Sequence, residues 1–115
     1  MKDQVLSRQI SDLPNTIIRQ VMGQIAQDPT LSEVTIYEFI GTEEAHHGSS
    51  HPVVKVVNNW GDAWEMFEHP DNWRSFRYDY LVWNQIIVYH VDRMSGHTTV
   101  TYRTAESFRN SPCSE

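Results

Sequence analysis

The segment from Tyr78 to Asp92, "YDYLVWNQIIVYHVD", decides the fold of this chain together with residues 97–104, "HTTVTYRT". Both segments are dense in β-branched and aromatic residues, which favour strands. Between them stands "RMSG" at 93–96, a short connection that ends on a glycine, as hairpin loops commonly do. The pattern therefore predicts an antiparallel hairpin in the last third of the sequence.

Two further strands are predicted earlier in the chain. The stretch "EVTIYEFIG" at 33–41 combines β-branched and aromatic residues with a closing glycine, and "VVKVV" at 53–57 is a short apolar run. The connection between them, "TEEAHHGSSHP" at 42–52, is longer than a tight hairpin requires, so we expect a flexible loop there. Strands that follow one another in pairs favour antiparallel pairing.

Helical periodicity occurs in three places. Residues 2–13 have apolar side chains at helical spacing, and at 15–27, "NTIIRQVMGQIAQ", they form one wide stripe. These patterns predict two N-terminal helices. Between the strand pairs, "NNWGDAWEMFEHPDNWRSF" at 58–76 predicts a Trp-rich amphipathic helix that is capped near Asn59 or Asp62. We expect it to break at His69-Pro70 and to be followed by one more helical turn.

The elements together predict the α+β class. A chain of 115 residues has the length of one domain and buries enough surface for one core. We therefore expect residues 1–115 to form a single α+β domain with two N-terminal helices and a mainly antiparallel sheet of about four strands. The helices are expected over one face of that sheet, and residues 110–115 are expected to form a loose tail.

Composition narrows the class of protein further. Hydrophobic residues make up 39% of the chain, with four Trp, five Tyr and four Phe, a content that disordered chains lack. The single cysteine, Cys113, excludes an intramolecular disulfide and a cysteine-based zinc site, which fits a reducing compartment. No apolar run approaches the roughly 18 residues that cross a bilayer, and the first residues lack a signal-peptide pattern. We therefore expect a cytoplasmic protein without a membrane partner.

The charge balance indicates the kind of partner. Nine Lys and Arg stand against 15 Asp and Glu, for a formal net charge of −6. The chain has no basic stripe of the kind that binds a phosphate backbone, so direct binding to nucleic acid is disfavoured. An acidic surface favours a protein partner with a basic surface, including a nucleic-acid-binding protein. The alternative is that mild acidity only keeps the domain in solution.

The densest run of negative charge lies in the Trp-rich segment, where four acids and no Lys or Arg occur from Trp60 to Asn72. On a helical wheel the aromatic residues gather on one face and most acids on the other. An aromatic anchor with a negative rim is a common layout of protein interfaces. The predicted partner-binding residues are Trp60, Asp62, Trp64, Glu65, Glu68, Asp71 and Trp73. The alternative is that the rings only cover the sheet.

The loop at 42–52 contains three histidines, His46, His47 and His51, beside two glutamates. Imidazole and carboxylate groups are suitable ligands for a metal such as zinc. However, a His pair four residues apart needs a helix to converge, and glycine, serine and proline make this segment a turn. We therefore expect a solvated loop and no metal or cofactor, with these histidines as the alternative metal ligands.

A catalytic alternative rests on His90, Asp92 and His97. Side chains alternate along a strand, so His90 and Asp92 are expected on the face that carries Ile86 and Val88, where they could form an acid-base group. The His-x-Ser/Thr units at His47 and His97 also resemble the motif of two-histidine phosphoesterases, which act on phosphodiesters. The simpler interpretation is that His90 is a strand histidine whose ring nitrogens are hydrogen-bonded.

The leading hypothesis is therefore a non-enzymatic protein that acts by stoichiometric binding, as an inhibitor or regulator of a partner with a basic surface. In size and charge the chain is similar to small proteins of phages and mobile elements, such as anti-CRISPR, anti-restriction and immunity proteins. The alternative is a small His-dependent enzyme or ligand-binding domain for a phosphodiester or small molecule. A third hypothesis is a homodimer joined through a sheet edge or the Trp face.

Overall fold

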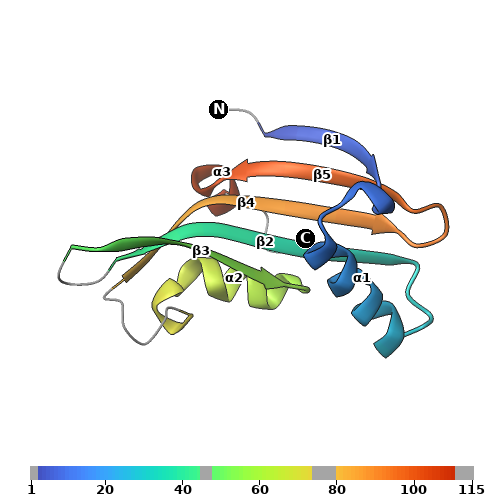
Figure 1. Cartoon of the computed structure of the whole chain (residues 1–115), viewed down its shortest axis with the longest axis horizontal. Helices are drawn as coiled ribbons and strands as arrows, with labels where there is room; N and C mark the ends of the chain where they lie inside the picture. The colour runs from blue at the N-terminus through green and yellow to red at the C-terminus, as the bar shows by residue number, and fades with distance from the viewer. Residues whose placement is uncertain (1–2, 45–47, 74–79, 111–115) are drawn as a thin grey trace.

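The computed structural model describes residues 3–44, 48–73 and 80–110, which form a five-stranded antiparallel sheet with three α-helices (Figure 1). The strand order in the sheet is β1-β5-β4-β2-β3. In chain order the elements are β1 (Gln4–Gln9), the 3-10 turn η1 (Ile10–Asp12), α1 (Asn15–Gln27), β2 (Glu33–Glu44), β3 (Ser50–Val57), α2 (Trp60–Glu68), the 3-10 turn η2 (Pro70–Asn72), β4 (Tyr80–Asp92), β5 (His97–Thr104) and α3 (Ala105–Arg109). The predicted α+β class is confirmed.

The N-terminal segment differs from its prediction. The helix predicted over residues 2–13 is wrong, because Gln4–Gln9 is a strand and Ile10–Asp12 is a 3-10 turn. β1 pairs with β5 along its whole length, from Gln4 opposite Tyr102 to Gln9 opposite His97. Its hydrogen bonds are thus made to a neighbouring strand, which overrides a weak helical pattern. The sheet consequently has five strands rather than about four.

The second predicted helix, residues 15–27, is confirmed as α1. Pro14 stands directly before it, and its backbone nitrogen, which has no hydrogen to donate, leaves no unsatisfied donor there. Ile17 and Val21 of α1 are fully buried against β2, β4 and β5. This face of the helix is the apolar stripe that the sequence predicts.

The helices cover both faces of the sheet, so the expectation of a single covered face is wrong. α1 packs on one face, in a core that includes Ile36, Ile87 and Tyr89. α2 and α3 pack on the other face, in a core that includes Phe39 and Ile86. Figure 1 shows α1 at one end of the strands and α2 at the other. The reason lies in β2 and β4, whose apolar residues occur at both odd and even positions and must be covered on both sides.

A β-bulge between β2 and β4 changes which side chains of β4 point to each face of the sheet. The register between β2 and β4 shifts between Ile40 and Gly41, so that Ile40 lies opposite Gln85 and Gly41 lies opposite Trp83. Trp83 is thereby buried on the same face as Ile86, although one position is odd and the other even. The Trp83 indole N–H donates to the carbonyl of Met66 in α2, at 2.9 Å. The bulge therefore joins the sheet to the Trp-rich helix.

The loop predicted at 42–52 is strand at both of its ends. β2 continues to Glu44 and β3 begins at Ser50, with Glu43 opposite His51 in the ladder. The prediction of a loop is therefore wrong at both of its ends. Residues 45–47, and with them His46 and His47, lie outside the described residues, as do residues 111–115 of the predicted tail.

Replacing Gly41 by alanine tests the close contact at the bulge. A Cβ at this position would lie 2.2 Å from the carbonyl oxygen of Val82, which belongs to the backbone and has little freedom to move. We expect Gly41→Ala to lower the free energy of unfolding by about 3 kcal/mol, measured by urea denaturation. Gly23→Ala is the matched control, since nothing lies within 4 Å of a Cβ on this exposed position of α1. It should be neutral or stabilising, by up to about 1 kcal/mol. Equal effects of the two substitutions would contradict the bulge contact.

Candidate functional site

The Trp-rich helix α2 begins at a reciprocal cap. The backbone N–H of Asp62 donates to the Asn59 side-chain oxygen at 2.8 Å, and the Asn59 amide donates to the Asp62 carboxylate at 2.9 Å. The helix ends before Pro70, which starts the 3-10 turn η2. These contacts stabilise the first turn, where a negative charge is also favoured by the helix dipole. Asp62, a predicted partner-binding residue, therefore has a structural role in the cap of α2.

The rings of α2 pack around Phe108 of α3, which is fully buried. Ring centroids of Trp60, Trp64 and Phe67 lie 5.3, 6.0 and 5.0 Å from that of Phe108. Trp60 and Trp64 are nevertheless only half-buried, as is Trp73, which packs against the same core. The inner sides of these rings thus pack against the core, and part of their outer surface remains exposed.

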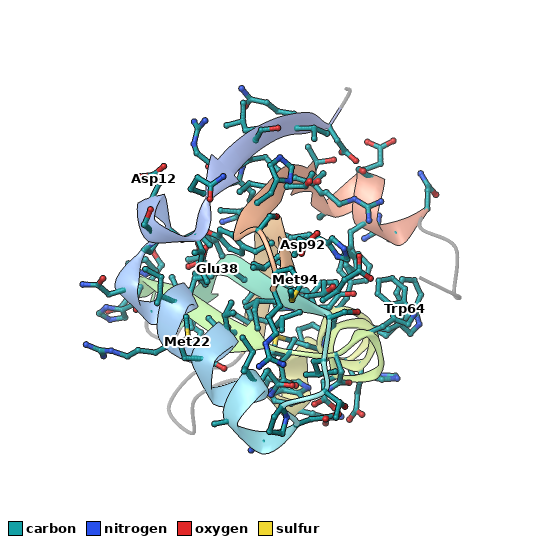
Figure 2. The ribbon with its side chains drawn as sticks, turned by 90° about the vertical axis from the view of Figure 1, so that its right-hand side faces the viewer. Asp12, Met22, Glu38, Trp64, Asp92 and Met94 are labelled. Atoms are coloured by element: carbon teal, nitrogen blue, oxygen red, sulfur yellow. The ribbon has the colours of Figure 1, made fainter. Side chains whose placement is uncertain are left out.

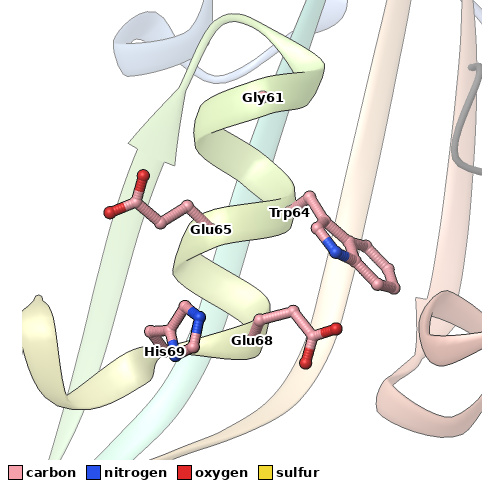
Figure 3. Close-up of a pocket in the computed structure, with 5 residues that line it drawn as sticks. All are labelled: Gly61, Trp64, Glu65, Glu68 and His69. Atoms are coloured by element: carbon pink, nitrogen blue, oxygen red, sulfur yellow. The ribbon is translucent and has the colours of Figure 1, made fainter.

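The outer side of α2 is acidic. Glu65 and Glu68 are exposed, and within the part of the chain that the structure describes neither makes a hydrogen bond or an ion pair. Together with Gly61, Trp64 and His69 they line a surface hollow, in which Glu68 lies on the Trp64 side of the helix and Glu65 on the other (Figure 3). Figure 2 shows the Trp64 ring at the surface, on the opposite side of the molecule from Met22 of α1. We call Trp64, Glu65 and Glu68 the outer face of α2. The side chain of Asp71 lies outside the described part.

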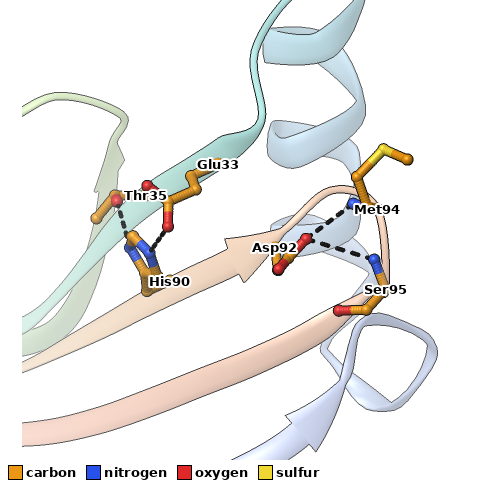
Figure 4. Close-up of polar contacts among 6 residues, drawn as sticks. All are labelled: Glu33, Thr35, His90, Asp92, Met94 and Ser95. Atoms are coloured by element: carbon orange, nitrogen blue, oxygen red, sulfur yellow. Dashed lines mark hydrogen bonds and ion pairs between the residues drawn. The ribbon is translucent and has the colours of Figure 1, made fainter.

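His90 is held by two residues of β2 (Figure 4). Its Nε2–H donates to the Glu33 carboxylate at 3.0 Å. In the neutral ring, Nδ1 then accepts from the Thr35 hydroxyl, also at 3.0 Å. Both ring nitrogens are therefore partnered, and the side chain remains 46% exposed. As predicted, His90 lies on the sheet face that carries Ile86 and Val88.

The other two residues of the catalytic alternative lie apart from this contact. The Asp92 carboxylate accepts from the backbone N–H groups of Met94 and Ser95, at 2.9 and 3.4 Å, and so closes the hairpin turn (Figure 4). His97 is at the start of β5, opposite Gln9 of β1. Among the described residues no hydrogen bond or ion pair connects His90, Asp92 and His97. The carboxylate beside His90 is Glu33, which the sequence pattern did not indicate.

A cavity of about 410 Å³ lies next to His90, between the start of α2 and the open part of the sheet. Its lining residues come from α2 and its cap, β2, β4 and β5: Thr35, Tyr37, Asn59, Trp60, Val88, His90 and Thr101. Sequence reasoning selected only Trp60 and His90 from this set. The alternation of "HTTVTYRT" predicts that Thr99 and Thr101 share a face of the sheet. Whether His90 lies on that same face depends on the register of β5 against β4, which the sequence does not give.

The metal alternative finds no support in the described part of the chain. No group of three or more His, Cys, Asp or Glu residues that could hold a metal ion occurs there. His51 lies in β3, opposite Glu43, whereas His46 and His47 lie outside the described residues.

None of the described helices has both the length and the apolar character needed to cross a bilayer.

Comparisons of this chain with protein-family models, with curated proteins and with solved structures found no match.

The surroundings of Tyr89, in β4, perturb the pKa of its phenol. It is buried under α1, and its hydroxyl donates to the Glu38 carboxylate at 2.8 Å. Burial, and then the neighbouring Glu38 carboxylate, raise the pKa of Tyr89 well above its ordinary value of 10.0. The neutral phenol is therefore favoured in the folded chain.

This pair predicts a loss of stability in alkaline solution. The unfolded chain releases the Tyr89 proton near pH 10 and the folded chain holds it to higher pH. Its contribution to folding is therefore complete below pH 10 and falls as the pH rises further. The difference in free energy of unfolding between wild type and Tyr89→Phe should shrink from pH 9 to pH 11, measured by urea denaturation. Tyr102→Phe, at a half-buried position of β5, removes a phenol that is only the smallest of the causes that raise the pKa of Tyr89, so it should alter this pH dependence much less. A difference that is constant with pH would contradict the prediction.

Proposed function

We propose that this protein acts by stoichiometric binding to a protein with a basic surface, and that the outer face of α2 is the binding surface. The observation that carries the proposal is the combination of two exposed carboxylates, Glu65 and Glu68, without partners in the described part of the chain, beside the half-exposed ring of Trp64. A half-exposed ring gives an interface an apolar anchor at low conformational cost. The carboxylates of Glu65 and Glu68 form a negatively charged rim beside this anchor.

Electrostatics supports the choice of partner. The whole chain carries a formal net charge of −6, so its long-range field attracts a basic surface before contact. The two carboxylates would then find their counter-charges on Lys or Arg of the partner. Basic surfaces of this kind are typical of proteins that bind nucleic acid. The proposed activity is inhibition or regulation of such a protein, as in the small phage and mobile-element proteins that have a similar size and charge.

The packing of α2 favours binding by the folded chain without rearrangement. Trp64 is stacked between Trp60 and Phe67, with centroid distances of 5.7 Å to each, so the ring is fixed before a partner arrives. Pre-organised anchors lose little entropy on binding. Asp62 and the inner sides of the rings are structural, which leaves Glu65 and Glu68 as the residues to vary.

The double substitution Glu65→Lys with Glu68→Lys tests the proposal. The tagged wild-type chain should capture one dominant protein from a lysate in a ratio near one to one, and this protein should have a basic surface. The double variant should recover at least about tenfold less of it, because reversing charges at a contact replaces attraction by repulsion. Binding should also weaken when the salt concentration is raised from 50 to 500 mM.

The matched control reverses two acids away from α2. Asp12 and Asp28 are both exposed, and they lie in the turn before α1 and at its end, where the Asp28 carboxylate also accepts from Thr30. Asp12→Lys with Asp28→Lys makes the same change in net charge, and its capture of the partner should fall much less than that of the α2 double variant. Undiminished capture by the α2 double variant would refute the outer face of α2 as the binding surface. Equal losses of partner capture in both double variants would show that binding depends only on the net charge of the chain, and not on the outer face of α2.

A further inference from the structure

The cavity beside His90 occupies a part of the sheet that α2 leaves open. Asn59 and Trp60, at the start of α2, form one side of it, and the strands β2, β4 and β5 form the rest. Its volume of about 410 Å³ falls within the range of small-molecule sites. It lies on the sheet and at the first turn of α2, whereas the outer face of α2 begins one turn later. The cavity and the outer face of α2 are therefore separate surfaces, and ligand binding at one does not depend on partner binding at the other.

The lining combines an aromatic side with a polar edge. Trp60 presents a half-buried ring, while Tyr37 and Val88 are buried beneath it in the sheet. The polar groups of the lining residues are the hydroxyls of Thr35, Tyr37 and Thr101, the imidazole of His90 and the amide of Asn59. Within the described part of the chain, the Thr101 hydroxyl makes no hydrogen bond to another residue. A ligand that offers it a partner would satisfy this group.

The groups around the cavity are already held in place. The Trp60 ring contacts Tyr37, Trp64 and Phe108, with centroid distances of 6.0, 5.7 and 5.3 Å. The His90 ring is oriented by Thr35 and Glu33, and the Asn59 side chain by its bonds to Asp62. A site with fixed side chains binds a rigid ligand without paying much for ordering.

The charge around the cavity selects against anions. No Lys or Arg is among its lining residues. Two carboxylates contact lining residues: Glu33 accepts from His90 and is 63% exposed, and Asp62 accepts from Asn59. A phosphate group here would meet negative charge without a Lys or Arg in the lining to balance it. The chemistry of the lining therefore fits an uncharged ligand.

We propose that this cavity binds a small uncharged heteroaromatic ring with hydrogen-bonding groups on its edge, of the nucleobase or nucleoside class. The flat ring lies against Trp60, as bases do on aromatic side chains, and its polar edge meets the hydroxyls of Thr101 and Thr35, beside the His90 ring. Stacking on an aromatic side chain does not depend on the identity of the base, so the site is defined by ring shape and neutrality rather than by one compound.

Adenosine is the probe for the first experiment, because a purine has the largest ring surface among the bases. Titration of the full chain, followed by amide chemical shifts in NMR, should give saturable binding with a Kd on the order of 0.1 mM. The largest shifts should occur at Thr35, His90 and Thr101. Absence of binding at 5 mM adenosine, or shifts confined to other parts of the chain, would overturn the proposal.

Variants locate the site through a matched pair on one strand. Thr101→Val keeps the β-branched shape and removes the hydroxyl, and should raise the Kd about fivefold. Thr99→Val makes the same change two residues away on the same strand face, opposite His90 but outside the lining, and should raise the Kd less than Thr101→Val does. His90→Gln should weaken binding similarly, whereas His97→Gln should not. Equal Kd values for wild type, Thr101→Val and His90→Gln would place adenosine elsewhere and overturn the site. The chemical shifts of the wild type test its location even if a variant fails to fold.

Two counter-probes test the chemical class. Adenosine monophosphate adds a phosphate to the same ring, and the absence of cations in the lining predicts binding at least about threefold weaker than that of adenosine. Maltose is neutral and polar but has no aromatic ring, and should not bind at the same concentration. Tighter binding of the monophosphate would overturn the neutral-ligand assignment, and binding of maltose in preference to adenosine would overturn the heteroaromatic one.

Discussion

The pairing of β2 with β4 is the interaction on which the rest of this structure depends. These are the two longest strands, and they run antiparallel from Glu33 opposite Asp92 to Glu44 opposite Tyr80. Their apolar side chains point to both faces, with Phe39 and Ile86 on one side and Ile36 and Tyr89 on the other. A strand pair of this kind is stable only when both faces are covered, since each face exposes a continuous apolar strip.

The two covering layers divide the molecule into surfaces of different character. α1 and α2 lie on opposite faces and at opposite ends of the strands (Figure 1). Each face is therefore covered over one part and open over the other. The outer face of α2 is available because its inner side completes a core around Phe108. The cavity beside His90 exists because α2 begins only at Trp60 and leaves the neighbouring part of the sheet open. Both candidate surfaces thus follow from where one nine-residue helix starts and ends.

The same side chains serve packing and recognition in this arrangement. Trp60 contacts the buried Phe108 and also lines the cavity. Trp64 stacks against its neighbours in α2 and also borders the acidic hollow. Because each ring is held by the core, its exposed part is rigid, which favours binding surfaces that do not change on contact. The polar residues differ, since Asp62 and Asp92 close local turns, whereas Glu65 and Glu68 have no such task within the described residues.

The sequence by itself determined the local structure of most of this chain: the β4–β5 hairpin, the strands at 33–41 and 53–57, α1, and α2 with its Asn59 cap. These elements are specified by contacts between near neighbours, namely side-chain periodicity, caps and turn residues. Only the tertiary structure decided that residues 4–9 form an edge strand, that helices cover both faces, and that Glu33, Thr35 and Thr101 gather around His90. Each of these features depends on strand order, on register and on a one-residue bulge at Gly41. Shifting the register by one residue moves every side chain of a strand to the opposite face, and the pattern along a single strand does not carry that information.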